Sequence, residues 1–490
     1  MKYQSSRNDD ITAGSTAAVL QGMAPDGGLY VSKAFEDLHF DWQATLKLDT
    51  YAMAAQILGA LLPDFENMEE LVRKAYDGKF DSPELTPLKA VGDRYVLELF
   101  RGPTSAFKDV ALSMLPQLIT AARKQEGVRD EIVILTATSG DTGKAALEGF
   151  RDVEGTRIIV FYPREGVSVV QQAQMVTQEG RNVCVCAVEG NFDDAQNGVK
   201  EIFRTTDLRG SGARLSSANS INIGRLAPQV VYYFRAYADL LDAGRISRGD
   251  AVDFVVPTGN FGDILAGYIA KLIGLPVGKL VCASNENNVL TQFLETGCYD
   301  RLRPFHKTLS PSMDILVSSN LERLLFLLSD SAAVSGYMQA LSEKGSYQIS
   351  EALLAKIQAQ FPCGCCNDLE TSETIAEVWN AHQYLLDTHT AVAWRVADAY
   401  LAQANSSAPL VVLSTASPYK FPAAVLAALG EDSSQDEFAL MRRLQEKTGV
   451  PIPAQLAALE QKPLRHKDAI AREDMKAYVL EKVRQTAWIE

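Results

Sequence analysis

The sequence predicts an α/β protein in which parallel sheets are covered by helices on both faces. Short β-branched runs alternate with amphipathic segments of helical length, an order typical of βαβ units. The predicted strands are 95–100, 131–137, 157–162, 182–188, 251–257, 279–285 and 410–415. Clear helical segments are 140–152, 168–179 and 226–241. Active sites in such folds lie beyond the carboxyl ends of the strands, so the loops after the strands are the first candidates.

The chain has 490 residues, which is enough for two or three domains. Residues 1–85 are helix-rich after a turn at 25–28 and end at two prolines, so we predict a small N-terminal domain there. Residues 86–490 form the rest, with two α/β subdomains. A mostly helical insertion at about 287–405 and a helical tail beyond 431 complete this prediction.

Composition excludes several classes of partner. A formal net charge of −14 opposes broad affinity for nucleic acid or anionic membrane. No run approaches the ~20 apolar residues of a membrane span, and the first residues contain no apolar signal core. Seven unevenly spaced cysteines predict a reducing, cytoplasmic compartment. Cys363, Cys365 and Cys366 lack a second ligand pair at metal-site spacing, so we predict free thiols and no metal.

One lysine stands at an unusual place, the turn between a predicted strand and a predicted helix. Residues 102–109 read GPTSAFKD, and Lys108 immediately precedes the helical segment. The positive end of the helix dipole lowers the pKa of an amine at that position. A neutral amine is the form that attacks an aldehyde to give a Schiff base. Most lysines are merely solvated, so the loops after the other strands must decide whether Lys108 is reactive.

The loop after the strand at 131–137 is a candidate anion site. Residues 138–143 read TSGDTG and open a predicted helix, so hydroxyls and backbone N–H groups converge at its N-terminus. An ordinary capped turn fits the same residues. A nucleotide P-loop does not, because it needs glycine in place of Thr138 and serine or threonine in place of Ala145.

Three further segments carry donors: two follow predicted strands and one precedes a predicted helix. Residues 257–263, PTGNFGD, contain two glycines that let several N–H groups point at one dianion. Residues 219–225 add amides, a hydroxyl and Arg225, whose guanidinium suits phosphate, although a surface ion pair fits it as well. Thr415 fits both a donor to an aromatic ring nitrogen and a cap of the next helix.

Taken together, these segments resemble the threonine synthase family, pyridoxal-phosphate enzymes of fold type II with a tryptophan-synthase-β-like fold. The resemblance covers almost the whole chain and rests on several long motifs in the right order. Besides the turns above, these motifs are QGMAPDGGLY at 21–30, NENN at 285–288, SPSMD at 310–314 and STASPYKF at 414–421.

The resemblance implies a role for each of these residues. Lys108 would carry pyridoxal 5'-phosphate as an internal aldimine. The coenzyme phosphate would be held by Gly259, Asn260, Phe261, Gly262 and Asp263, and its ring nitrogen by Thr415. The substrate would be held around its amino acid part by Thr138, Ser139, Asp141 and Thr142, and around its phosphate by Asn219, Ser220 and Arg225.

The implied reaction turns O-phospho-L-homoserine and water into L-threonine and phosphate, the last step of threonine biosynthesis. Phosphate leaves the γ-carbon, water adds at the β-carbon, and Lys108 serves as both anchor and base. No partner beyond this small-molecule substrate is implied, and both a monomer and a homodimer stay open.

Three other interpretations remain to be weighed. A serine or threonine dehydratase would share Lys108 and the glycine turn, but it holds no phosphorylated substrate, so Arg225 favours the synthase. A non-catalytic coenzyme-binding protein would not need the substrate-side donors. A penicillin-binding acyl enzyme matches Ser105-x-x-Lys108, residues 217–219 and residues 447–449, yet the last of these ends a helical run where that class needs a strand.

Overall fold

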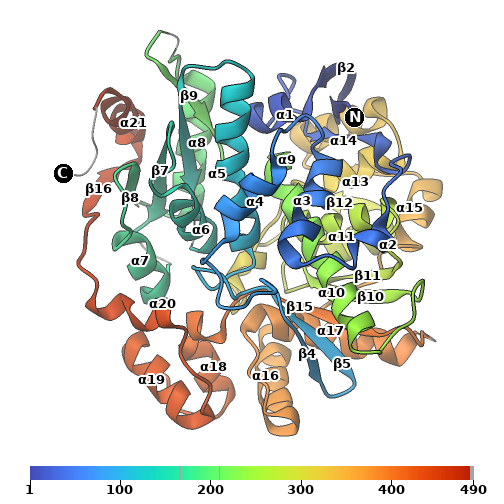
Figure 1. Ribbon diagram of the computed structural model, residues 1–490. Coiled ribbons are helices and arrows are strands. Elements are labelled where there is room, and N and C mark those ends of the chain that lie inside the picture. The colour runs from blue at the N-terminus through green and yellow to red at the C-terminus, as the bar shows by residue number, and fades with distance from the viewer. Residues whose placement is uncertain (139, 165–166, 209, 405, 486–490) are drawn as a thin grey trace.

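Two sheets of mostly parallel strands organise the chain, one in each half of the view in Figure 1. The computed structural model describes residues 1–138, 140–164, 167–208, 210–404 and 406–485. All seven predicted strands are present, with bounds that differ by at most two residues, and helices cover the sheets. The predicted α/β class is therefore confirmed.

The larger sheet has six strands in the order β14-β11-β10-β15-β5-β4, of which only β4 runs antiparallel. Alternate residues of a strand face opposite sides, so Phe254 packs on Tyr233 while Val255 belongs to a separate core. Its strands are β4 (Leu88–Val91), β5 (Arg94–Glu98), β10 (Val252–Pro257), β11 (Val277–Ser284), β14 (Cys363–Cys365) and β15 (Leu410–Ser414).

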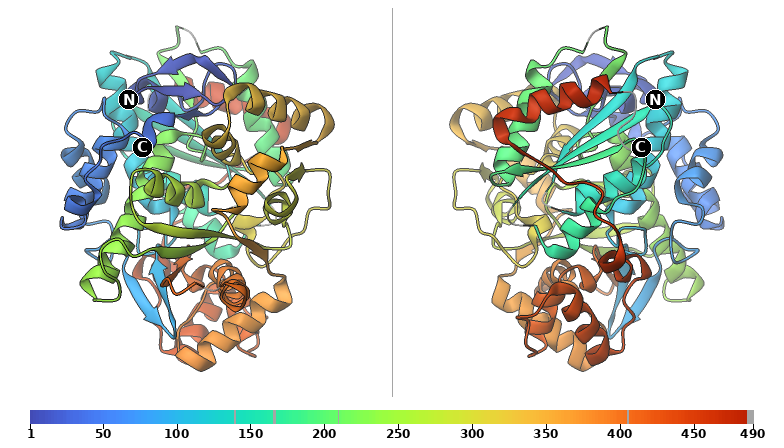
Figure 2. Two further views of the ribbon diagram at one scale, coloured as in Figure 1. Left: turned by 90° about the vertical axis from the view of Figure 1, so that its right-hand side faces the viewer. Right: turned by 90° about the vertical axis from the view of Figure 1, so that its left-hand side faces the viewer.

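The smaller sheet has five parallel strands in the order β16-β8-β7-β6-β9. Its strands are β6 (Glu131–Ala137), β7 (Thr156–Pro163), β8 (Val183–Glu189), β9 (Ala213–Ser216) and β16 (Asp468–Ala471). Strand β16 lies in the tail that we expected to be helical, so that expectation was wrong there. The tail follows the outside of the molecule to reach this sheet edge (Figure 2).

Helices fill the connections between these strands. Around the smaller sheet they are α5 (Lys108–Gln125), α6 (Asp141–Phe150), α7 (Val169–Val176), α8 (Phe192–Thr205) and α21 (Met475–Arg484). Around the larger sheet they are α9 (Ile223–Leu226), α10 (Val230–Asp242), α11 (Gly262–Leu272), α16 (Asp368–His382) and α17 (Thr388–Gln403). The insertion adds α12 (Val289–Thr296), β12 (Cys298–Asp300), η3 (Pro311–Met313), α13 (Leu321–Leu328), α14 (Ser331–Lys344), β13 (Ser346–Gln348) and α15 (Glu351–Gln358). The tail adds η4 (Pro418–Lys420), α18 (Pro422–Ala428), α19 (Glu437–Thr448) and α20 (Ala454–Ala457).

The N-terminal segment contains a small antiparallel sheet that the sequence did not predict. Its elements are β1 (Tyr3–Ser5), β2 (Asn8–Ala13), α1 (Ser15–Gln21), β3 (Tyr30–Val31), α2 (Trp42–Thr45), α3 (Thr50–Leu61) and α4 (Met68–Tyr76). The segment contacts the central helices directly, because the Tyr76 hydroxyl donates to the Val110 carbonyl at 3.0 Å. Asn222 Nδ2 likewise donates to the Val19 carbonyl at 2.9 Å. A domain boundary at residue 85 stays a prediction.

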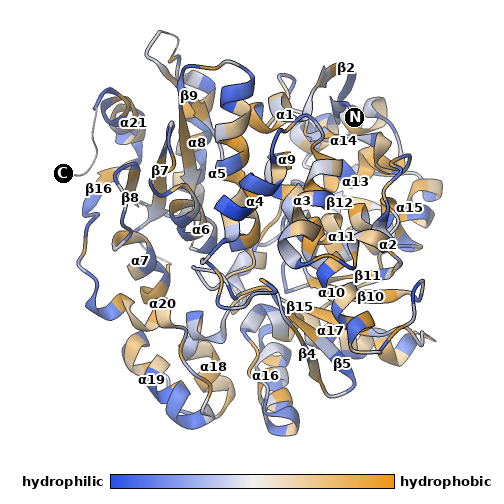
Figure 3. Ribbon diagram, viewed as in Figure 1, coloured by the Kyte–Doolittle hydropathy of each residue, from blue (hydrophilic) through white to orange (hydrophobic). Residues whose placement is uncertain are grey.

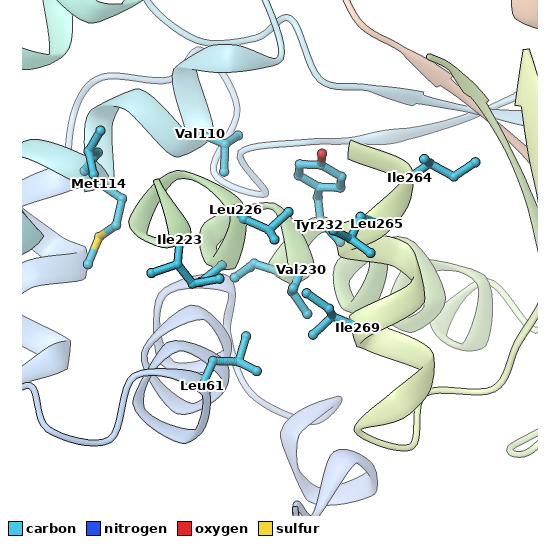
Figure 4. Close-up of a cluster of buried hydrophobic side chains, with 14 of the residues drawn as sticks. Leu61, Val110, Met114, Ile223, Leu226, Val230, Tyr232, Ile264, Leu265 and Ile269 are labelled. Atoms are coloured by element: carbon cyan, nitrogen blue, oxygen red, sulfur yellow. The ribbon is translucent and has the colours of Figure 1, made fainter. Parts of the chain in front are cut away.

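A continuous apolar core supports the turns that follow the strands (Figure 4). Val110 of α5, Ile223 of α9 and Ile264 of α11 all belong to it, and Leu61 of α3 joins from the N-terminal segment. Helix α5 begins at Lys108, α9 contains Arg225, and α11 begins within the glycine turn. Their shared core therefore fixes the positions of these three segments relative to one another. In Figure 3 the central strands are coloured largely as hydrophobic. In the described part of the chain, no helix is both long and apolar enough to cross a membrane.

Candidate active site

The turn before α5 is joined to the loop after β15. The Phe107 N–H donates to the Thr415 carbonyl at 2.8 Å, and the Ser417 N–H donates to the Ser105 carbonyl at 3.1 Å. Ser105 has a φ of 59°, a left-handed conformation that is uncommon for serine. The turn is therefore held in shape by a segment more than three hundred residues further along the chain.

Lys108 is the first residue of α5 and is only 8% exposed. Its Nζ lies 3.4 Å from Ser312 Oγ and 4.0 Å from Asp141 Oδ2. Burial lowers the pKa of Lys108 to about 8, since the nearby charges of Asp141, Arg225 and Lys420 act in opposite directions. The predicted direction of this pKa shift is confirmed, but burial rather than the helix dipole is its main cause.

Asp141 is the carboxylate that faces two lysines. Its Oδ1 accepts hydrogen bonds from Lys420 Nζ at 2.5 Å and from Gln171 Nε2 at 2.9 Å. Burial alone would raise the pKa of Asp141, but Lys420 and Lys108 outweigh burial and hold it well below its ordinary value. Asp141 thus lies in the site as a counter-ion to lysines. Sequence analysis named Lys420 only within a motif and assigned it no role.

The remaining residues of the loop after β6 differ in what their side chains do. Thr138 Oγ1 accepts from the backbone N–H groups of Gly140 and Gly143, each at 3.0 Å, which is the capped-turn arrangement. The Thr142 side chain is half-buried and forms no hydrogen bond with any described residue. Ser139 lies outside the described residues.

The turn after β10 presents backbone donors. Among the described residues, the N–H groups of residues 259–263 have no hydrogen-bond acceptor. A Cβ at Gly259 would lie 3.0 Å from the Ser312 carbonyl oxygen, so glycine permits this close approach. Phe261 has a φ of 62° and begins α11. Free N–H groups around such a turn form a cradle for an anion.

Two side chains of this turn face away from its backbone donors. The Asp263 carboxyl accepts a hydrogen bond from each of Tyr232 and Tyr233, at 2.5 and 3.1 Å, between α10 and α11. Burial raises the pKa of Asp263 to about 7. The Phe261 ring packs on Phe361. These two residues contribute their backbone N–H groups to the cradle, whereas Asn260 is exposed and accepts at Oδ1 from Ser319 Oγ at 3.4 Å.

Arg225 is a buried guanidinium without an acidic partner among the described residues. Its Nη1 donates to the Ala218 carbonyl at 2.8 Å, and burial lowers its pKa to about 10. It lies close enough to Lys108 to lower the pKa of that lysine. A buried cation with this lack of compensation is costly unless an anion joins it.

The segment of Asn219 and Ser220 leads from β9 toward Arg225. The Ser220 hydroxyl lies 3.4 Å from Ser319 Oγ, the residue that also contacts Asn260, so the two segments meet. Arg323, completely buried, fixes this region by donating to the Ser220 and Ile221 carbonyls. Sequence analysis missed Ser319 and Arg323, and their only signal was the apolar helix that begins after Ser319 and contains Arg323.

Thr415 directly follows β15 and is buried. Its carbonyl accepts from Phe107, and its hydroxyl has no hydrogen-bond partner among the described residues. Ser417, two residues later, is the cap of η4 and accepts from the Tyr419 N–H. The Thr415 hydroxyl is therefore left available to a ligand.

A fold of two parallel sheets with a buried, low-pKa lysine beside a glycine-turn anion cradle defines the class of pyridoxal-phosphate-dependent enzymes. The family model for pyridoxal-phosphate-dependent enzymes matches residues 81–356. Models for the threonine synthase N terminus and the threonine synthase C-terminal region match residues 2–76 and 390–479.

The chain belongs to the threonine synthase family. It is 40% identical over 432 residues to threonine synthase of Pseudomonas aeruginosa, covering 87% of this chain and 90% of that protein. It is 41% identical over 433 residues to human threonine synthase-like 1, covering 84% of this chain but only 57% of that longer relative.

Solved structures agree with the family assignment. The pyridoxal-phosphate-bound threonine synthase from Brucella melitensis superposes with a TM-score of 0.86 at 39% identity and covers 99% of both chains. Yeast threonine synthase has the same TM-score at 34% identity and covers 98% of both chains. The fold type expected from the resemblance is confirmed.

Proposed function

We propose that this chain is a threonine synthase, which converts O-phospho-L-homoserine and water into L-threonine and phosphate. The observation that carries this proposal is Arg225, a buried guanidinium that lies close to Lys108 and has no carboxylate partner among the described residues. Lys420, buried there as well, is already paired with Asp141, so in the described part of the chain no carboxylate pairs with Arg225. A phosphorylated substrate supplies the missing negative charge.

The residues present fit pyridoxal phosphate. In the part of the chain that the structure describes, the N–H groups of residues 259–263 and the Thr415 hydroxyl have no hydrogen-bond partner, so they suit its phosphate and its ring nitrogen respectively. Lys108 has a pKa of about 8, so its neutral form is available to the aldehyde near neutral pH. When bound, the coenzyme supplies an electron-withdrawing ring that stabilises negative charge at the α-carbon of the amino acid.

The chain's own residues have separate roles in the proposed reaction. Lys108 anchors the coenzyme, takes the proton from the substrate α-carbon and returns it when threonine is released. Arg225, with Asn219 and Ser220, holds the phosphate that leaves the γ-carbon. Thr142, at the start of α6, binds the substrate carboxylate. Asp141 keeps the positive charge of the lysine pair balanced.

Product analysis tests this proposal against its rivals. Purified protein loaded with coenzyme and given O-phospho-L-homoserine should release inorganic phosphate and L-threonine in equal amounts. Release of phosphate together with a 2-oxo acid would instead identify a lyase of the dehydratase type. Retention of bound coenzyme without any product would identify a non-catalytic binding protein. A cytoplasmic location and the choice between monomer and homodimer stay predictions.

A further inference from the structure

One loop of the insertion contacts both halves of the proposed coenzyme site. Ser312, in η3, places its Oγ 3.4 Å from Lys108 Nζ. The carbonyl oxygen of the same residue lies where it would be 3.0 Å from a Cβ on Gly259. A displacement of Ser312 would therefore change the surroundings of the lysine amine and of the glycine turn together.

A buried histidine holds Ser312 in this position. The Ser312 N–H donates to His389 Nε2 at 3.1 Å, and His389 is 2% exposed. Because Nε2 accepts this bond, the ring proton is on Nδ1, which donates to Asp387 Oδ1 at 2.9 Å. The Thr390 hydroxyl donates to the other Asp387 oxygen, so the acceptor of the ring proton is itself fixed.

The ends of the loop have anchors of their own. Asn285 Nδ2 donates to Ser310 Oγ at 3.0 Å and to Asp314 Oδ1 at 2.8 Å. Asn287 Nδ2 also donates to Asp314 Oδ1, at 2.9 Å. These bonds do not involve His389, so the loop stays attached when the histidine bond is lost. The specific task of His389 is the orientation of the Ser312 peptide.

We propose that His389 is a positioning residue that acts through Ser312 on Lys108 and on the glycine turn. Its hydrogen bond orients Ser312 so that the Ser312 hydroxyl lies beside the Lys108 amine and the Ser312 carbonyl packs against Gly259. The inference rests on the proposed function only in requiring that Lys108 be the coenzyme lysine.

The first measurement separates the two proposals. Holoprotein is reduced with borohydride and the labelled peptide is mapped. An adduct on a residue other than Lys108 overturns the proposed function, whereas the remaining measurements, made with the adduct on Lys108, judge the role of His389.

The decisive comparison is His389→Gln against His389→Asn. A glutamine oxygen reaches the position of Nε2 and can accept from Ser312, whereas an asparagine amide reaches only the position of Nδ1. His389→Asn should raise the Kd of the coenzyme about tenfold, shift the visible absorbance maximum of the holoprotein and lower kcat more than it raises KM. His389→Gln should keep the coenzyme Kd and kcat within about threefold of the parent protein and leave the absorbance maximum unchanged. His39→Asn, at an exposed histidine, is the control.

Ser312→Ala keeps the backbone bond and removes only the hydroxyl, so it tests the proposal even if His389→Asn fails to fold. It should shift the absorbance maximum and lower kcat, with the coenzyme Kd within about twofold of the parent. If His389→Gln and His389→Asn change the coenzyme Kd, the absorbance maximum and kcat equally, His389 only packs against Phe421 and the proposal is overturned. An unchanged spectrum and kcat in Ser312→Ala would overturn it as well.

Discussion

Lys108 and Lys420 are two buried lysines that share one carboxylate, yet their environments differ. Lys420 Nζ lies 2.5 Å from Asp141 and also donates to the Thr104 carbonyl at 3.2 Å, so two acceptors hold it. Lys108 Nζ lies 4.0 Å from Asp141, and its one hydrogen-bond partner among the described residues is the Ser312 hydroxyl at 3.4 Å. A buried lysine whose carboxylate partner is distant gives up its proton more easily, and burial lowers the pKa of Lys108 to about 8. The difference indicates which of the two reacts.

The largest expected effect comes from removing the loosely held lysine. Lys108→Ala should abolish the visible absorbance of the bound coenzyme and lower turnover by about 10³-fold or more, because anchor and base are lost together. Spectra and steady-state rates of the purified variant are the measurements. Lys124→Ala, at an exposed position of the same helix, is the control. Survival of both signals in Lys108→Ala would refute the assignment.

Removing the tightly held lysine should damage stability instead. Lys420→Met leaves Asp141 with a single, more distant cation, and loss of one partner of a buried pair costs about 3–5 kcal/mol. The free energy of unfolding in denaturant should fall by that amount. Borohydride should still trap coenzyme on Lys108 in the folded fraction. A shift of the adduct in this variant, or stability equal to the parent's, would erase the distinction between the lysines.

The third cation of the site sharpens the comparison. Arg225→Ala should lower kcat/KM for O-phospho-L-homoserine by about 10²-fold or more while coenzyme stays bound, because two charge-assisted hydrogen bonds are lost. Coenzyme loss would mean that the guanidinium holds the coenzyme phosphate instead. Arg214→Ala, at a half-exposed position of β9, should leave kcat/KM unchanged.

The smallest effect is the pH dependence of coenzyme attachment. The amine of Lys108 is protonated below its pKa of about 8 and neutral above it. The rate at which coenzyme-free protein takes up pyridoxal phosphate should therefore rise about tenfold per pH unit below pH 8 and level off above it. Because Arg225 contributes to the lowered pKa of Lys108, the plateau should move to higher pH in Arg225→Ala. A rate that keeps rising toward pH 10.5 would show an ordinary lysine.

The strands predicted from sequence were those that are buried in the two sheets. Strand β10, for example, is buried at every position, so its apolar run is visible without any partner. Strand β16 has two exposed and two half-buried residues, and only its pairing with β8 makes it a strand. The polar strand β2 escaped prediction for the same reason.

The site was predictable where a turn carries its own chemistry. Lys108 and the glycine turn directly follow predicted strands, and Arg225 lies among amide and hydroxyl donors before a predicted helix. The roles of Ser312, His389 and Lys420 depend on contacts between segments far apart in the chain, so no local pattern shows them. The loop of Asp141 was located correctly, but its lysine partners could be seen only in three dimensions.

The edge strand β16 also bears on how the molecule is made. Residues 468–471 complete a sheet whose other strands precede them by hundreds of residues in the chain. Until these residues are synthesised, the outer N–H and C=O groups of β8 lack the partner strand β16. Such an open edge is where a nascent chain pairs with its neighbours on a polysome. We therefore expect this edge of the smaller sheet to be open to such pairing until the tail has left the ribosome and β16 has formed.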